Sequence, residues 1–220
     1  ERRLVKNLVT GLPHRTSALR CLGAVANVFA LESSMDDLAI AAGEDPIAYR
    51  LAQLDDPRAI AVLETLRDRI ADLSATAEGQ GLCIDVTVTD LAEVRLDRVV
   101  MVADAGRVVD LAGLIAQLEG GVIQGASWAL CEEVQWDRDG VTSLDWDSYT
   151  VLRFDKMPTM DVHVLDQPTE RPLGAGEASP GPTVAAIANA VADAVGCRVF
   201  ELPITADRVY KALRDTADKG

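Results

Sequence analysis

The hydrophobic period of this chain changes near Cys83, and this change restricts the folds that the chain can adopt. In residues 24–73, apolar side chains recur at the three- and four-residue spacing of amphipathic helices. From Cys83 onward, Ile84, Val86 and Val88 alternate with polar residues, as in a strand with one buried face. The sequence therefore predicts an α+β fold, in which a helical segment packs beside a small mixed β-sheet.

Three helices are predicted before the change of period. Gly43 is suited to end the first helix, whose apolar stripe comprises Val25, Val28, Phe29, Glu32, Met35, Leu38 and Ala42. Asp45-Pro46 and Asp56-Pro57 each place an N-cap residue before a proline at the first helical position. The third helix is expected to run to about Leu73, and residues 74–81 are expected to form a loop. The buried side of the third helix comprises Leu63, Leu66 and Ile70.

After the change of period, a strand from Leu96 to Val102 is predicted to form a hairpin with the strand that begins at Cys83. A tight turn at Trp136–Gly140 and a strand at Met160–Leu165 follow. The predicted helices are residues 111–130, residues 185–195 and a final helix from Thr205 with Val209, Tyr210 and Leu213 facing inward. The patterns divide the chain into a helical segment, residues 1–73, and an α+β domain, residues 74–220.

Composition and charge exclude several classes of function. The chain has 35 acidic and 21 basic residues, a net charge of −14, and no basic cluster, so nucleic-acid binding is not expected. No apolar run is long enough for a membrane span and no signal peptide opens the chain, so a cytoplasmic protein is expected, with a periplasmic face possible through a partner subunit. No metal ligands are assigned, because the four cysteines have no short pairing and only His14 and His163 accompany them.

The segment Pro172–Pro182 is the strongest candidate for chemistry. It contains three glycines, three prolines and a single ionisable residue, Glu177. Glycine permits backbone conformations that other residues avoid, and proline stiffens the chain, so the segment can hold a carboxylate in a fixed place. A glutamate held in this way can act as a general base. Alternatively, Glu177 caps the following helix or binds a backbone amide, and local features alone favour this alternative.

The predicted helix at residues 111–130 contains Gly120, Gly121 and Gly125. Each glycine costs a surface helix about 1 kcal/mol relative to alanine. The helix must therefore gain from the close approach of another backbone or of a ligand.

Four groups of residues occur in an order that identifies a family resemblance. They are Arg15–Gly23 with residues 27–37, Gln117–Gly125 with Ser127–Val134, Asp147–Phe154, and Gly174–Val191 with Leu202–Thr205. Together they resemble the C-terminal end of the molybdopterin-binding subunits of molybdenum hydroxylases, the family of xanthine dehydrogenase and aldehyde oxidase. The similarity is greatest to subunits of the isoquinoline-oxidoreductase type, and it extends over nearly the whole chain.

The resemblance implies roles for four residues. Glu177 matches the glutamate of the Gly-x-Gly-Glu loop, the general base in the hydroxylation of an aldehyde or N-heteroaromatic compound with water as the oxygen source. Gln117 matches a glutamine that contacts the pterin, and Arg20 matches an arginine whose loop closes over the molybdenum from the other side. Gly176 matches the cofactor-binding part of the Gly-x-Gly-Glu loop. Without the resemblance, we would predict that Gln117 is a solvated helix residue and that Arg20 belongs to a surface ion pair.

The resemblance also implies cofactors and partners. The cofactor is molybdenum-molybdopterin in its cytosine dinucleotide form, and 2Fe–2S clusters and FAD or haem lie on partner subunits. Because family subunits are several times longer, this chain is expected to be the C-terminal piece of a split subunit. A second molybdopterin-binding chain would supply the N-terminal half, an iron–sulfur subunit would accept electrons, and a small molecule would be the substrate.

Two departures from the family pattern leave other hypotheses open. The usual loop reads aromatic-Arg-Gly-aromatic-Gly, whereas this chain has Leu19–Gly23 with Cys21 in place of the first glycine. In addition, Gly79–Leu82 runs directly into the strand at Cys83, where relatives usually have another strand. A non-catalytic assembly or scaffolding subunit is therefore the competing hypothesis, and a metal-free small-molecule binding module is the third.

Overall fold

The computed structural model describes residues 11, 18–70, 77–79 and 81–218, and of residues 77–79 only the backbone. The predictions for residues 15–17 and for residues 74–76 and 80 of the loop lie outside the described residues. Two predictions are wrong: the third helix ends at Arg69 rather than near Leu73, and residues 77–79 of the predicted loop form a short strand that pairs with the strand starting at Leu82. The helices are α1 (Ala24–Ala42), α2 (Pro46–Leu51), α3 (Pro57–Arg69), α4 (Leu111–Leu130), α5 (Pro180–Val195) and α6 (Ala206–Ala217), with a short 3₁₀ helix at Phe154–Lys156.

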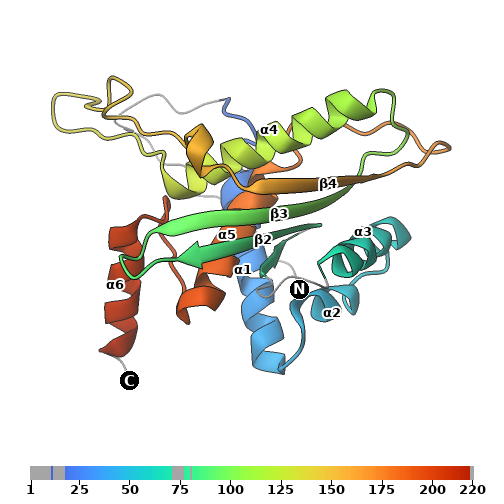
Figure 1. Cartoon of the computed structure of the whole chain (residues 1–220), viewed down its shortest axis with the longest axis horizontal. Coiled ribbons are helices and arrows are strands. Elements are labelled where there is room, and N and C mark those ends of the chain that lie inside the picture. The colour runs from blue at the N-terminus through green and yellow to red at the C-terminus, as the bar shows by residue number, and fades with distance from the viewer. Residues whose placement is uncertain (1–10, 12–17, 71–76, 80, 219–220) are drawn as a thin grey trace.

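A mixed four-stranded sheet lies at the centre of the chain (Figure 1). Its strands, in the order β1-β2-β3-β4, are β1 (Ala77–Gly79), β2 (Leu82–Val88), β3 (Val94–Asp104) and β4 (Thr159–Leu165). The β1–β2 and β2–β3 pairs are antiparallel, whereas β3 and β4 are parallel, with α4 in the connection between them. The predicted α+β fold, the hairpin and the mixed sheet are confirmed.

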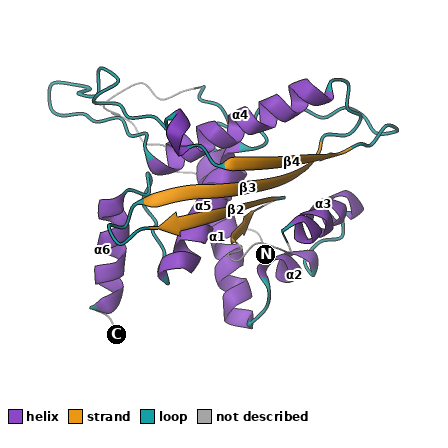
Figure 2. Cartoon of the chain, viewed as in Figure 1, coloured by secondary structure: helices purple, strands orange, loops and turns teal. Residues whose placement is uncertain are grey.

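Helices cover both faces of the sheet, as Figure 2 shows. On one face, Val99 and Met101 of β3 belong to a core that includes buried residues of α4 and α5. On the other face, Val100 and Val102 pack with α2 and α3, through a second core that includes Leu66. This alternation along β3 follows from the two-residue period of a strand, and it explains why residues 99–103 of β3 are all apolar.

The boundaries of the short helices agree with their capping residues. The Asp45 side chain accepts a hydrogen bond from the Ala48 N–H before α2, and Asp56 accepts one from Arg58 before α3. Gly43 and Gly196 end α1 and α5 in the left-handed conformation that favours glycine. The helix α5 begins at Pro180, five residues before the predicted start at residue 185.

The predicted apolar stripe of α1 is wrong in part. The buried face of α1 carries Glu32, Ser33, Asp36 and Ala39, while Leu38 is 52% exposed. Arg50 of α2 explains this arrangement, because it forms ion pairs of 3.0 Å with both Glu32 and Asp36. A buried cation from another helix thus allows two carboxylates to face the interior.

The prediction for α6 is correct for only one of three residues. Val209 is fully buried, but Tyr210 and Leu213 are exposed.

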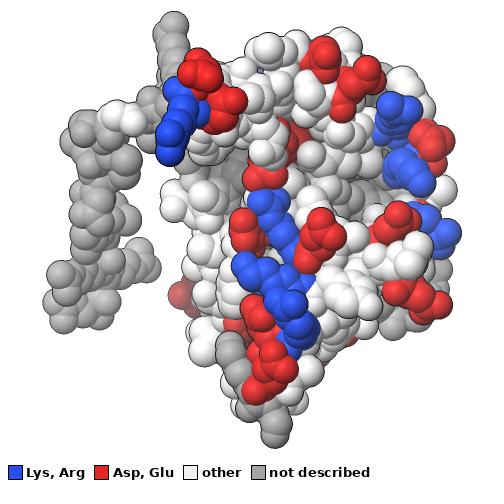
Figure 3. Space-filling model, turned by 90° about the vertical axis from the view of Figure 1, so that its left-hand side faces the viewer, with Lys and Arg blue, Asp and Glu red and all other residues white. Residues whose placement is uncertain are grey.

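On the side of the molecule where α6 lies, basic residues lie among acidic ones rather than in a continuous basic patch (Figure 3). Arg208, for example, pairs with Glu133 at 2.8 Å and with Glu201 at 3.1 Å. None of the helices in the described ranges is long and apolar enough to cross a membrane.

Candidate functional site

The structure brings together the four site residues that the sequence predicts. The Gly176 carbonyl accepts hydrogen bonds from Arg20 Nε at 2.6 Å and from Gln117 Nε2 at 3.2 Å. Arg20 also donates to the Gln117 carbonyl at 3.3 Å and to Gln124 Oε1 at 3.0 Å. Glu177 follows Gly176 in the chain, so the turn before α1, the middle of α4 and the loop before α5 meet at one place.

Glu177 binds a backbone amide, but it does not cap α5. Its carboxylate Oε1 accepts a hydrogen bond from the Cys21 N–H at 3.1 Å, and its side chain is exposed on the surface of this chain. The N-cap residue of α5 is Ser179, which makes no side-chain capping bond. Instead, Ser179 Oγ donates a hydrogen bond to the Leu118 carbonyl at 2.8 Å, and this bond links the loop that carries Glu177 to α4.

The turn that carries Arg20 has an unusual backbone. Cys21 and Leu22 have φ values of 68° and 48°, in the left-handed region that costs a residue with a Cβ about 1–2 kcal/mol. The turn is closed by the Leu22 N–H, which donates to the Leu19 carbonyl at 3.0 Å, and by the Ala24 N–H, which donates to the Cys21 carbonyl at 2.8 Å. The conformation of Cys21 is the one that glycine adopts most easily.

Cys21 is a site residue that the sequence reasoning did not identify. It is buried, and its Sγ lies 3.0 Å from the Glu177 carbonyl oxygen. Burial raises the pKa of this thiol, as does the neighbouring Glu177 carboxylate, although a backbone hydrogen bond from Gly181 and the Arg20 charge oppose the shift. The sequence signal that points to Cys21 is its position directly after Arg20, in the loop that the resemblance identifies.

Two of the three α4 glycines allow α5 and the Glu177 loop to approach α4 closely. A Cβ at Gly121 would overlap Ser179 Oγ, and a Cβ at Gly125 would lie 2.7 Å from the Pro180 carbonyl oxygen. Gly120 differs, because a Cβ there would have no neighbour within 4 Å. The predicted close approach of another backbone is therefore present at Gly121 and Gly125.

The polar groups of this site suit an anionic, hydrogen-bonding ligand. Within the described ranges Arg20 forms no ion pair with a carboxylate, and its three guanidinium nitrogens donate to neutral oxygens of Gly176, Gln117 and Gln124. In the same part of the chain, Gln117 Oε1 and Glu177 Oε2 have no hydrogen-bond partner. Molybdopterin carries donors and acceptors on its pterin ring edges and a phosphate on its side chain, and amide and guanidinium groups can recognise both.

Direct metal coordination by this chain is a separate question. No three His, Cys, Asp or Glu side chains in the described ranges lie close enough to hold a metal ion.

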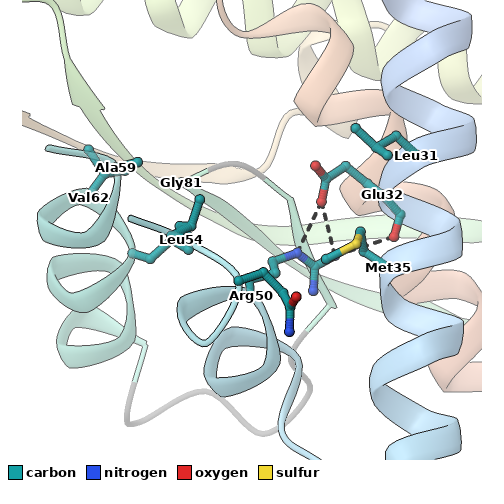
Figure 4. Close-up of a pocket in the computed structure, with 10 residues that line it drawn as sticks. Leu31, Glu32, Met35, Arg50, Leu54, Ala59, Val62 and Gly81 are labelled. Atoms are coloured by element: carbon teal, nitrogen blue, oxygen red, sulfur yellow. Dashed lines mark hydrogen bonds and ion pairs between the residues drawn. The ribbon is translucent and has the colours of Figure 1, made fainter. Parts of the chain in front are cut away.

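A separate apolar cavity of about 370 Å³ lies between α1, α2 and α3 (Figure 4). None of the four predicted site residues lines it. Leu31, Met35, Leu54 and Val62 contribute to its wall. Its ionic residues are already engaged, because Arg50 bonds to Glu32 as the dashed lines show. The cavity therefore offers apolar space, and its charged wall residues pair with each other.

Comparisons with known proteins identify relatives of this chain. The profile of the molybdopterin cofactor-binding domain matches residues 74–158. The chain is 38% identical to a nicotinate dehydrogenase subunit of Pseudomonas putida, with 90% of the chain and 20% of the relative aligned. It is 30% identical to the beta subunit of isoquinoline 1-oxidoreductase of Brevundimonas diminuta, over 84% of the chain and 26% of the relative. The chain thus spans 20–26% of the length of these two relatives.

Solved structures share the fold. Aldehyde oxidoreductase from Desulfovibrio gigas matches with a TM-score of 0.53 and 26% identity, over 60% of this chain and 15% of that one. Quinoline 2-oxidoreductase from Pseudomonas putida 86 matches with a TM-score of 0.57 and 22% identity, over 61% of this chain and 18% of that one.

Proposed function

The chain belongs to the molybdenum hydroxylase family, in which it matches part of the molybdopterin-binding subunit, and we propose that it forms one wall of a catalytic molybdenum-cofactor site. The proposed reaction is the oxidation of an aldehyde or an N-heteroaromatic compound, with water as the oxygen source and Glu177 as general base. The observation that carries the proposal is the meeting of Arg20, Gln117 and the Glu177 loop at the Gly176 carbonyl.

When bound, the molybdenum cofactor supplies the two-electron oxidation. We assign to Arg20 and Gln117 the binding of the cofactor, through the guanidinium charge and the Gln117 amide oxygen. The Glu177 carboxylate is held at Oε1 by the Cys21 N–H. Its other oxygen, Oε2, can take up the proton released when water provides the oxygen atom, which is the task of a general base.

The rest of the subunit is proposed to cover a second surface of this chain, in the connection between α4 and β4. Trp146 and Phe154 of this connection are 77% and 93% exposed. The connection is nevertheless well anchored, because Tyr149 donates to Glu132 at 2.6 Å and Ser127 Oγ accepts from the Leu152 N–H at 3.0 Å. Large aromatic side chains held in exposed positions are typical of interfaces.

The remaining assignments follow from the family. We propose the cytosine dinucleotide form of molybdopterin, a second chain with the other part of the binding site, an iron–sulfur subunit with 2Fe–2S clusters, and FAD or haem as a further carrier. Residues 1–73 would supply the arginine loop and residues 74–220 the loop of Glu177. A cytoplasmic location is proposed on the same basis.

Replacement of Glu177 tests the proposal. Glu177→Gln keeps the size of the side chain but cannot accept a proton, so turnover should fall by about 10²–10⁴-fold while bound molybdenum stays unchanged. Glu177→Asp should recover only part of the rate, because its carboxylate is withdrawn by one methylene. Glu170, an exposed glutamate that also lies between β4 and α5, provides the matched control, and Glu170→Gln should keep wild-type turnover.

The competing function, a non-catalytic assembly subunit, gives a different result. Molybdenum content and turnover per molybdenum would then both stay at the wild-type level in Glu177→Gln. Measuring metal content, melting temperature and rate on the same preparations separates the two functions.

A further inference from the structure

The loop that carries Glu177 is held by the turn before α1 at two successive carbonyls. Arg20 donates to the Gly176 carbonyl at 2.6 Å, and Cys21 Sγ lies 3.0 Å from the next carbonyl, that of Glu177. The same Cys21 donates its backbone N–H to the Glu177 carboxylate at 3.1 Å. One residue of the turn thus contacts both the backbone and the side chain of the proposed base.

The thiol can serve as the donor in this contact. Burial holds the pKa of the Cys21 thiol above its ordinary value, so the sulfur stays protonated at neutral pH. The Glu177 carbonyl is an acceptor only, so the thiol hydrogen must lie between the two atoms.

The backbone of the turn makes the double contact possible. At a φ of 68°, Cys21 directs its N–H toward the Glu177 carboxylate while its side chain reaches the Glu177 carbonyl. A glycine would adopt this conformation with less strain but would have no side chain to donate. The strained conformation of Cys21 therefore occurs together with a contact that glycine cannot make, the contact of the thiol with the Glu177 carbonyl.

We propose that Cys21 is a positioning residue for Glu177, and that its thiol fixes the Glu177 peptide while its N–H fixes the carboxylate. This role of Cys21 rests on the proposed function, because it requires that Glu177 is the general base. The thiol acts through Glu177. Loss of the thiol should therefore lower kcat, the rate of the catalysed step, more than it changes KM, which reflects substrate binding.

Three substitutions separate the thiol from the backbone N–H. Cys21→Ala and Cys21→Gly both remove the thiol donor and keep the N–H, and Cys21→Gly also relieves the left-handed strain. Both should lower kcat by about 10-fold with KM within about twofold, because a base displaced by a fraction of an ångström loses part of its rate advantage. Cys21→Ser keeps a donor at the same position and should restore kcat to within about threefold of wild type.

The contact also has readouts that do not depend on turnover. In infrared difference spectra of the isolated enzyme, wild type minus Cys21→Ala should show the S–H stretch of a hydrogen-bonded thiol. Hydrogen exchange in residues 174–178 should accelerate in Cys21→Ala and return toward wild type in Cys21→Ser. Cys131→Ser is the matched control, because burial also raises the pKa of the Cys131 thiol, and it should leave kcat and the Cys21 band unchanged.

Several results would overturn the proposal. Wild-type kcat in Cys21→Ala or Cys21→Gly would show that the thiol does not position the base. Equal losses of kcat in Cys21→Ser and Cys21→Ala, or a Cys21 band typical of a free thiol, would do the same. Wild-type turnover in Glu177→Gln would instead refute the proposed function, since the infrared band and the exchange rates report the Cys21 contact independently.

Discussion

The close approach of α4 to the Glu177 loop makes a sharp prediction for two adjacent glycines. A methyl group in Gly121→Ala would overlap Ser179 Oγ and lie 3.1 Å from both Arg20 Nη2 and Pro180 Cδ. A methyl group in Gly120→Ala would meet no atom within 4 Å. The two substitutions are chemically identical and one residue apart on the same helix, so each is a control for the other.

The magnitudes follow from three contributions. Replacing glycine by alanine inside a helix stabilises it by about 1 kcal/mol, and this gain applies to both variants. In Gly121→Ala, overpacking costs about 1–3 kcal/mol, and displacement of Ser179 Oγ costs about 1 kcal/mol because its hydrogen bond to the Leu118 carbonyl is lost. We therefore expect Gly121→Ala to destabilise by about 1–3 kcal/mol and Gly120→Ala to be neutral or stabilising by up to about 1 kcal/mol.

Thermal unfolding of the purified enzyme measures this difference. One kcal/mol corresponds to roughly 2–4 °C in Tm for a domain of this size, so Gly121→Ala should melt several degrees below Gly120→Ala. Gly121→Ala should also lower turnover, because the new methyl group lies against Arg20. Equal Tm and equal turnover in the two variants would refute the packing of α4 against the Glu177 loop.

Two further predictions concern polar anchors. Burial and the hydrogen bond to Glu132 raise the pKa of the Tyr149 hydroxyl from 10.0 to about 12. The hydrogen bond therefore stabilises the folded state fully below pH 10, and this contribution is lost as the pH rises toward 12. Tyr149→Phe should thus lower stability at neutral pH by about 1 kcal/mol in denaturant unfolding, and a loss that is the same at neutral pH and at pH 12 would contradict this. Arg50→Met leaves the buried Glu32 and Asp36 carboxylates without their shared cation, and should cost about 3–5 kcal/mol in the same assay. A loss below about 1 kcal/mol would show that the cluster is not buried as described.

Local signals are sufficient to predict most of the elements. Asp45 and Asp56 before prolines locate α2 and α3, because an N-cap and a proline act within one helical turn. The alternation from Ile84 onward identifies the β2–β3 hairpin for the same reason. Each of these patterns is complete within a few residues of the chain.

The errors occur where a distant residue decides the outcome. Periodicity predicts that Leu38 lies inside, but it cannot predict that Arg50 neutralises Glu32 and Asp36 on the inner face of α1. In α6 the buried face is narrower than the spacing of apolar residues indicates. Val209 lies on this face and Tyr210 lies outside it.

The candidate site is predicted from a resemblance rather than from local physics. On local grounds Arg20 and Gln117 are surface residues, and only their order along the chain links them to Glu177. The structure brings all three together at the Gly176 carbonyl. The position of Cys21 beside Arg20 draws attention to it, but its contacts with Glu177 cannot be predicted, because they depend on a left-handed turn that no short pattern indicates.

Molybdenum and pterin content tests the central claim most directly. The purified enzyme, isolated with the chains that accompany it, would be analysed for both and compared with Arg20→Ala and Gln117→Ala in the same assembly. We predict stoichiometric molybdenum and pterin per copy of this chain in wild type and reduced amounts in both variants. Wild-type enzyme that is fully assembled but contains neither component, or variants that retain both in full, would contradict the claim that these residues form a cofactor site.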